Sequence, residues 1–134
     1  MPEPIADSTE VMFRQVHPNF IDKGVVSSAA FRPTPKDSSK LSVDRSSLVS
    51  AELSFKGFKA RGWVSAAVYG VSVGEFSAEK IPCLPDPIEA SGADPGNGAH
   101  AVADYCAHSS SQQQNVAKRL RNKAVARGML YSEA

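Results

Sequence analysis

The stretch that decides the fold is residues 13–45, FRQVHPNFIDKGVVSSAAFRPTPKDSSKLSVDR. Apolar and polar residues alternate over 11–17, which predicts a strand that ends where Pro18 removes a ladder N–H. Its two predicted faces are Val11, Phe13 and Gln15 on one side, and Met12, Arg14 and Val16 on the other. Residues 41–43 alternate again and predict a second strand, after a proline-braced extended loop over 32–37. Both strands carry more polar groups than a core strand needs, which indicates a binding site.

The flanking sequence predicts further strands and helices. Ser50 is a suitable cap for a helix over 51–61, in which Leu53, Phe55 and Phe58 would form a buried stripe. The most apolar run, residues 63–73, predicts a central strand buried on both faces. The remaining predicted elements are a helical turn over 19–24, helical turns over 74–80, an extended edge segment over 81–87, a loop over 90–99, a strand over 101–105 and a helix over 116–127 that Gly128 ends.

This order of elements predicts one α+β domain over residues 11–134. We expect a mixed or antiparallel twisted sheet of four to five strands, two or three helices, and a basic C-terminal helix. A chain of 134 residues with 42% hydrophobic residues is long enough to bury a core. Residues 1–10 contain prolines and acids but little to bury, so they predict a flexible N-terminal lead.

Composition also bears on location and partners. The net charge of +1 argues against a protein coated in basic charge for nucleic acid. No apolar run approaches the ~20 residues that span a bilayer, and the acidic N-terminus lacks a hydrophobic signal core. Cys83 and Cys106 have no CxxC spacing, which favours buried free thiols in the cytoplasm, although a disulfide between them stays open.

Five residues are candidates for binding a ligand. Arg14 can clamp a phosphate, and Ser42 beside Arg45 can hydrogen-bond a ribose or an amide. His17 stands at the end of the first strand, and His100 follows a glycine-rich acidic loop, so either can orient a ligand. Arg14 and His17 are three residues apart and need a bulge or a strand end to share a site.

Several chemistries are set aside at this point. A hydrolase built from Ser42, His17 and Asp44 lacks a GxSxG elbow. The glycine-rich loop has no GxGxxG or Walker A sequence. The histidines and cysteines lack the paired spacing of a structural zinc site, so we expect no metal.

The predicted C-terminal helix carries a charge of +5 within twelve residues and no acid. Its basic residues are Lys118, Arg119, Arg121, Lys123 and Arg127. They could contact nucleic acid, although no aromatic residue for base stacking lies among them. Alternatively, the helix covers the sheet and its charges pair with acids of the 86–99 loop.

The string HPNFIDKGVVSSAAFRPTPKDSSKLSVDR, followed by Asp86-Pro87 and His100-Ala101, resembles a family of small uncharacterised bacterial proteins. That resemblance implies no activity. In outline, FRQVHPNFIDKG is similar to the first strand and turn of the ADP-ribosyltransferase-like superfamily. This second resemblance implies that Arg14 or His17 would help to hold NAD, that Gly24 would close the following turn, and that Ser42 would take the place of the polar group on the second strand. The chain lacks a matching catalytic glutamate.

The sequence therefore leaves three functions open. The first is a small bacterial accessory protein that binds a protein partner and has no cofactor. The second is a compact enzyme, or a degenerate relative of one, that uses NAD or another nucleotide. The third is nucleic-acid contact through the basic C-terminal helix.

Overall fold

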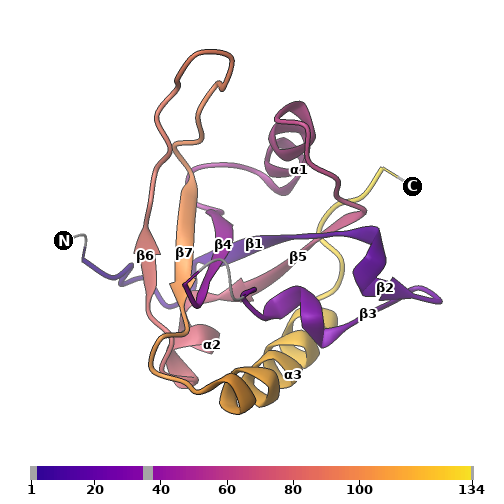
Figure 1. Cartoon of the computed structure of the whole chain (residues 1–134), viewed down its shortest axis with the longest axis vertical. Coiled ribbons are helices and arrows are strands. Elements are labelled where there is room, and N and C mark those ends of the chain that lie inside the picture. The colour runs from indigo at the N-terminus through magenta and orange to yellow at the C-terminus, as the bar shows by residue number, and fades with distance from the viewer. Residues whose placement is uncertain (1–2, 35–37, 134) are drawn as a thin grey trace.

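The computed structural model describes residues 3–34 and 38–133. The end of the predicted proline-braced loop, residues 35–37, lies outside the described residues. The chain forms one α+β domain around a five-stranded antiparallel sheet, as the sequence predicts (Figure 1). The strand order is β5-β1-β4-β7-β6. The strands are β1 (Val11–Val16), β4 (Lys40–Arg45), β5 (Ala67–Ser72), β6 (Cys83–Pro85) and β7 (His100–Asp104).

Helices cover both faces of this sheet (Figure 1). On one face lie α2 (Val73–Ala78), α3 (Ser110–Arg127) and the 3-10 turn η2 (Ser28–Phe31). Met12 and Val16 of β1 pack in the main core with residues of α3. On the other face lies α1 (Ala51–Ala60), whose Phe55 packs with Phe13 and Val68. The alternation predicted for β1 is therefore confirmed.

The predicted helical turn over 19–24 takes a different form. A 3-10 turn, η1 (Pro18–Phe20), leads into a small hairpin of β2 (Ile21–Asp22) and β3 (Val25–Val26). Lys23 and Gly24 both have positive φ, at 52° and 80°. A two-residue loop of that conformation matches the twist of a hairpin, so Gly24 serves a turn between strands.

The strand predicted as central lies at an edge of the sheet. β5 begins at Ala67, and within residues 3–34 and 38–133 the strand that pairs with it is β1. The chain after α3 covers the outer edge of β5. The Val68 N–H donates to the Tyr131 carbonyl, and the Leu130 N–H donates to the Val68 carbonyl, both at 2.8 Å. Because this edge is covered, β5 can have the apolar sequence that is typical of a central strand.

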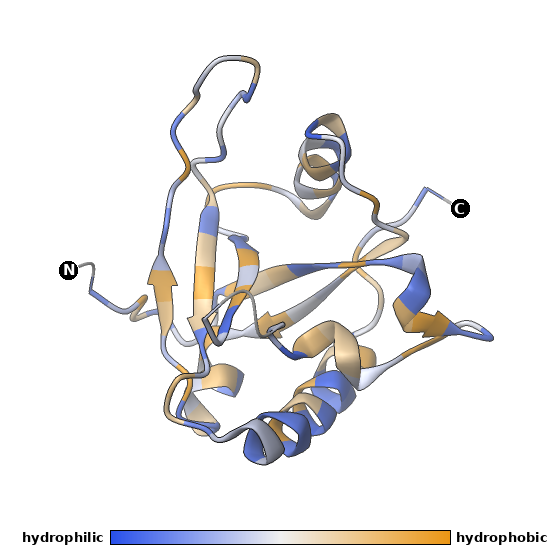
Figure 2. Cartoon of the chain, in the orientation of Figure 1, coloured by the Kyte–Doolittle hydropathy of each residue, from blue (hydrophilic) through white to orange (hydrophobic). Residues whose placement is uncertain are grey.

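Capping serines fix where the helices begin. Ser50 caps α1 as predicted, and Ser72 caps α2. A capping box of Ser109 with Gln112 starts α3 at Ser110, six residues before its predicted start. Gly128, with φ 97°, ends α3 as predicted. Figure 2 shows many hydrophilic residues along α3, and its buried face includes Val116, Ala117, Leu120 and Ala124.

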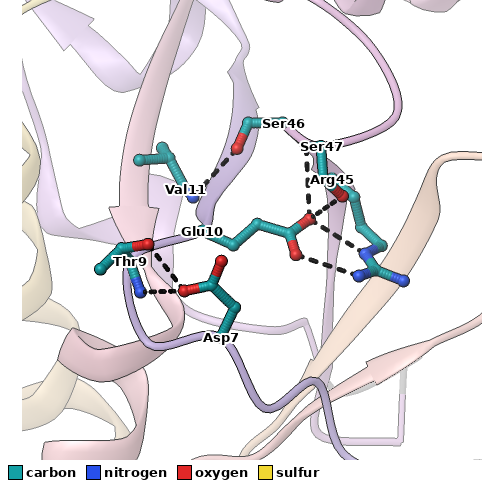
Figure 3. Close-up of polar contacts among 7 residues, drawn as sticks. All are labelled: Asp7, Thr9, Glu10, Val11, Arg45, Ser46 and Ser47. Carbon is teal, nitrogen blue, oxygen red and sulfur yellow. Dashed lines mark hydrogen bonds and ion pairs between the residues drawn. The ribbon is translucent and has the colours of Figure 1, made fainter.

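Residues 3–10, predicted to be a flexible lead, pack against the domain. Ile5 is buried, and its N–H donates to the Cys83 carbonyl on the edge of β6. Glu10 is buried in an ion pair with Arg45 (Figure 3). Composition did not show this, because the contacts are made with residues more than 30 positions away.

The two cysteines are both free. Cys83 is buried, as expected, but Cys106 is exposed, so the prediction of two buried thiols is wrong for Cys106. Among the residues described, no helix combines the length and the apolar character that crossing a membrane requires.

Candidate functional site

A cleft of about 320 Å³ opens between α1, the sheet face beneath it, and the chain that joins β6 to β7. We call residues 86–99 of that connection the arm. The arm rises beyond the sheet beside α1 (Figure 1). The cleft has three parts. They are a polar floor on the strands, an apolar rim on α1 and the loop that follows it, and the arm.

The floor is built by strand pairing. Asp44 of β4 is the Cα partner of Phe13 on β1 and of His100 on β7, so these residues form one row across three strands. Directly paired residues of antiparallel strands share a face and hold their Cβ atoms ~5 Å apart. Asp44 and His100 are therefore neighbours on the floor of the cleft.

Asp44 ends a chain of hydrogen bonds. Its Oδ1 accepts from Asn97 Nδ2 at 2.8 Å, and its Oδ2 accepts from Ser54 Oγ at 2.7 Å. Ser54 in turn accepts from Gln15 Nε2 at 2.8 Å, and Gln15 Oε1 accepts from Ser65 Oγ at 2.8 Å. Within the described residues no cationic side chain forms an ion pair with Asp44, so neutral donors alone solvate its carboxylate.

His100 is held by the start of the arm. Its Nδ1 lies 2.8 Å from the Asp86 carbonyl oxygen and 3.2 Å from Asp86 Oδ2. A carbonyl oxygen and an ionised carboxylate oxygen have no proton to donate and act only as acceptors. Nδ1 of His100 is therefore the donor and carries a proton. In the neutral ring Nε2 is then an acceptor, and no residue in the described part of the chain hydrogen-bonds to it.

The rim of the cleft is apolar and partly exposed. Leu53 and Trp63 border it with 60% and 50% of their surfaces exposed. Phe58 packs beside Trp63 with ring centroids 5.1 Å apart. Arg61 lies over the Trp63 ring at 4.7 Å and forms an ion pair with Asp94 at 3.0 Å, which ties α1 to the arm. The predicted burial of Leu53 is wrong, because Ser54 and Phe55 take the buried positions.

The arm continues the β6–β7 hairpin as an irregular ladder. Ile88 pairs with Asn97, and Ser91 pairs with Asp94. Gly96 has φ 78°, and a Cβ there would lie 2.7 Å from both the Ile88 carbonyl oxygen and the Ala90 nitrogen. Glycine is therefore required at the position that places Asn97 over Asp44.

Three of the five predicted ligand-binding residues, Arg14, Ser42 and His100, border the cleft. The Arg14 side chain, however, belongs to the β1 face that meets the main core. Its Nε donates to the Ala30 carbonyl at 2.7 Å, and its Nη1 donates to the Ser42 carbonyl at 3.1 Å. These bonds join β1, η2 and β4 where β1 and β4 diverge.

The other two predicted residues lie outside the cleft. His17 caps η1, because its Nδ1 accepts from the Asn19 N–H at 3.0 Å. Arg45 forms two hydrogen bonds with the Glu10 carboxylate. The predicted cluster of Arg14, His17, Ser42, Arg45 and His100 is thus only partly assembled.

The basic residues of α3 are largely engaged by other parts of the domain. Arg119 pairs with Glu79, and Arg127 pairs with Glu75, each at 2.8 Å. Arg121 donates to the Val26 carbonyl. The acids that pair with α3 therefore belong to the α2 region, and the 86–99 loop instead meets Arg61 of α1. Lys118 and Lys123 are exposed.

Sequence reasoning missed most of the cleft. Alternation along β4 places Asp44 and Ser42 on one face, but the sequence assigns Asp44 a chemical role only in the hydrolase trio. Gln15, Ser54 and Asn97 gave no separate signal, because each matters only through a partner distant in sequence. No group of histidine, cysteine or acidic side chains suited to a metal ion occurs in residues 3–34 and 38–133.

Comparison with known proteins gives no relative for this chain. No protein-family model matches the sequence, and no curated protein or solved structure matches it significantly. The function is therefore argued from the cleft itself.

Proposed function

We propose that this protein is a binding protein that receives part of a protein partner in the cleft. One observation carries the proposal, which is that Leu53 and Trp63 are both at least half exposed on the rim of the same concave site. Burying an exposed side chain of that size contributes about 1.5–3 kcal/mol. Tryptophan is also among the residues that most often dominate binding energy at protein interfaces.

The polar floor supports the same function. A side chain that enters between Leu53 and Trp63 reaches Asp44, Asn97 and His100, which offer hydrogen-bonding groups in fixed orientations. Fixed polar groups beneath an apolar rim give orientation and specificity to a bound segment. As part of the proposal we place the protein in the bacterial cytoplasm, where the free thiols of Cys83 and Cys106 would stay reduced.

A nucleotide ligand is the second candidate, favoured by the presence of Arg14, Ser42 and His100 on one cleft. It is the weaker of the two, because Nε and Nη1 of Arg14 donate to backbone carbonyls and the Asp44 carboxylate would repel a phosphate. Nucleic-acid contact through α3 is weaker again, since Arg119, Arg121 and Arg127 already hold partners within the domain.

The experiment uses the single tryptophan of the chain, Trp63, as a reporter. A displayed library of random twelve-residue peptides is selected against the protein, and the affinity of each enriched peptide is measured from Trp63 fluorescence. We expect Leu53→Ser to weaken binding at least tenfold, because Leu53 would be buried by the peptide. The matched control Val25→Ser, which alters an exposed apolar residue of the β2–β3 hairpin, should leave the affinity unchanged.

Two results would overturn the proposal. One is a set of enriched peptides whose affinity Leu53→Ser does not change. The other is a failure to select any peptide together with a rise in melting temperature on adding ADP-ribose, which would favour the nucleotide ligand by mass action.

A further inference from the structure

We infer that the partner inserts an arginine side chain into the cleft, with its guanidinium on Asp44 and His100. The inference rests on the proposed function and adds the chemistry of the group that is recognised. It follows from the distribution of charge around the cleft, from the hydrogen-bonding capacity of the floor, and from the shape of the rim.

The cations on the α1 side of the cleft are already neutralised, whereas Asp44 is not. Each basic residue of α1 and its C-terminal end forms an ion pair with an acid. These pairs are Lys56–Glu52, Lys59–Glu133 and Arg61–Asp94. Asp44 takes part in no ion pair among the residues that the structure describes. A half-buried carboxylate with only neutral donors attracts a cation, because the surrounding protein screens the charge less than water does.

The arm adds negative charge on the same side. Residues 86–99 of the arm contain Asp86, Glu89 and Asp94 but no lysine or arginine, and among the described residues only Asp94 pairs with a basic side chain of that kind, Arg61. An approaching group therefore meets a cleft whose arm repels anions and attracts cations. Arg14 borders the same cleft, but its side chain belongs to the opposite face of the sheet from Asp44, where its Nε and Nη1 donate to the carbonyls of Ala30 and Ser42.

The floor offers several acceptors to one planar donor group. Each oxygen of Asp44 accepts one hydrogen bond, from Asn97 or Ser54, and retains a second lone pair. His100 stands directly opposite Asp44 across β4 and β7, with Nε2 as its acceptor nitrogen. A guanidinium presents five N–H donors in a rigid plane, so it can meet two neighbouring acceptors at once.

The rim suits the rest of an arginine side chain. Its methylene groups would pack against Leu53 and Phe58, and a guanidinium can also lie against an aromatic ring. Arg61 already makes that contact with Trp63 inside the free protein, at 4.7 Å. Lysine would satisfy the charge, but a single ammonium does not match two acceptors on adjacent strands as well.

The test starts from the peptides selected on the cleft and replaces each arginine in turn with citrulline, which has nearly the same shape but no charge. We expect the enriched peptides to share one arginine whose replacement weakens binding about 10- to 100-fold, the usual effect of losing a charge-assisted hydrogen bond. In Asp44→Asn the difference between the arginine and citrulline peptides should fall to less than about threefold. Asp22→Asn, in the exposed hairpin, should leave the difference intact.

The results separate the inference from the proposed function. If peptides bind the cleft, as shown by their sensitivity to Leu53→Ser, but citrulline binds as well as arginine, then the inference is wrong and the binding function stands. If Leu53→Ser does not change the affinity of the peptides, the proposed function itself is wrong. Because citrulline changes only the peptide, this comparison remains decisive even where Asp44→Asn disturbs Ser54 and Asn97.

Discussion

Arg45 and Glu10 are joined by two parallel hydrogen bonds, Nε to Oε2 and Nη2 to Oε1, each 3.0 Å long (Figure 3). The Glu10 side chain is only 4% exposed, and its Oε2 also accepts from Ser47 Oγ at 2.7 Å. The pair connects the end of β4 to the segment before β1. It therefore fixes the N-terminal residues on the domain, a structural role for an arginine that the sequence suggested as a ligand-binding residue.

Replacing Glu10 with glutamine should lower the free energy of unfolding by on the order of 2–3 kcal/mol, because the change leaves Arg45 without its counter-charge in a partly buried site. Urea denaturation at neutral pH measures the change. The matched control is Glu52→Gln, which removes the acid of the exposed Glu52–Lys56 pair one helical turn apart. That control should cost only about 0.3–0.5 kcal/mol.

The same pair makes a pH prediction. Hydrogen bonds from Arg45 lower the pKa of Glu10 in the folded protein. A carboxyl group with a lower pKa when folded adds stability that is fully present above its pKa in the unfolded chain, about 4.5 for a glutamate. That stability is lost as the pH falls through the folded pKa. The gap between wild type and Glu10→Gln should be constant near neutrality and shrink as the pH falls below about 4.5, and a gap that does not shrink at all between about pH 4.5 and pH 3 would contradict this account.

The floor of the cleft predicts a second stability effect. Ser54 is buried, accepts from Gln15 and donates to Asp44, so Ser54→Ala leaves one donor and one acceptor without their partner. We expect a loss of about 1–3 kcal/mol in the free energy of unfolding. Ser77→Ala, on the exposed side of α2, is the control and should change stability by less than about 0.5 kcal/mol. Equal losses of unfolding free energy in Ser54→Ala and Ser77→Ala would show that the hydrogen bonds of Ser54 do not contribute to stability.

Local patterns predicted the elements of the fold well. Alternation over 11–16 identified β1 and its two faces, and Ser50 and Gly128 marked helix ends that the structure confirms. These signals depend on residues within a few positions of one another, which is the range over which strand alternation and helix capping act.

Long-range pairing decided what the sequence did not predict. β5 reads as a central strand, yet it lies at the edge and is covered by Leu130 and Tyr131, some 60 residues later. The cleft has the same origin, because Asp44 and His100 meet only through the register of β4 and β7. A strand sequence specifies its faces but not its neighbour, so the candidate site could be predicted only residue by residue and not as a cluster.

Two glycines predict opposite effects of the same substitution. A Cβ on Gly70 of β5 would lie 2.5 Å from Val11 Cγ1 and 2.7 Å from Leu130 Cδ1, so Gly70→Ala should destabilise the protein by about 1–3 kcal/mol through overpacking. Gly57 lies inside α1, and apart from its chain neighbours and the backbone of its own helix, no atom of the described residues lies within 4 Å of the position that a Cβ would take. Gly57→Ala should therefore stabilise the protein by about 0.5–1 kcal/mol. Thermal unfolding of both variants gives the comparison, and a loss of stability in Gly57→Ala would be inconsistent with an open helix surface.

The two thiols should differ sharply in reactivity. Burial raises the pKa of Cys83 to about 12, whereas Cys106 is exposed. Iodoacetamide at pH 8, followed by mass spectrometry of the digested protein, should show alkylation of Cys106 alone in the native state and of both cysteines in urea, because only a thiolate that the reagent can reach is attacked.

A single substitution tests the electrostatic part of that difference. The neighbouring Asp104 carboxylate raises the pKa of Cys106, so less thiolate is present at a given pH. Asp104→Asn should therefore speed alkylation of Cys106 several-fold, while Asp22→Asn, in the distant hairpin, should leave the rate unchanged. If Asp104→Asn instead exposed Cys83 to the reagent, the substitution would have loosened the β6–β7 pairing. The rate at Cys106 would then report a change in structure and not a change in pKa.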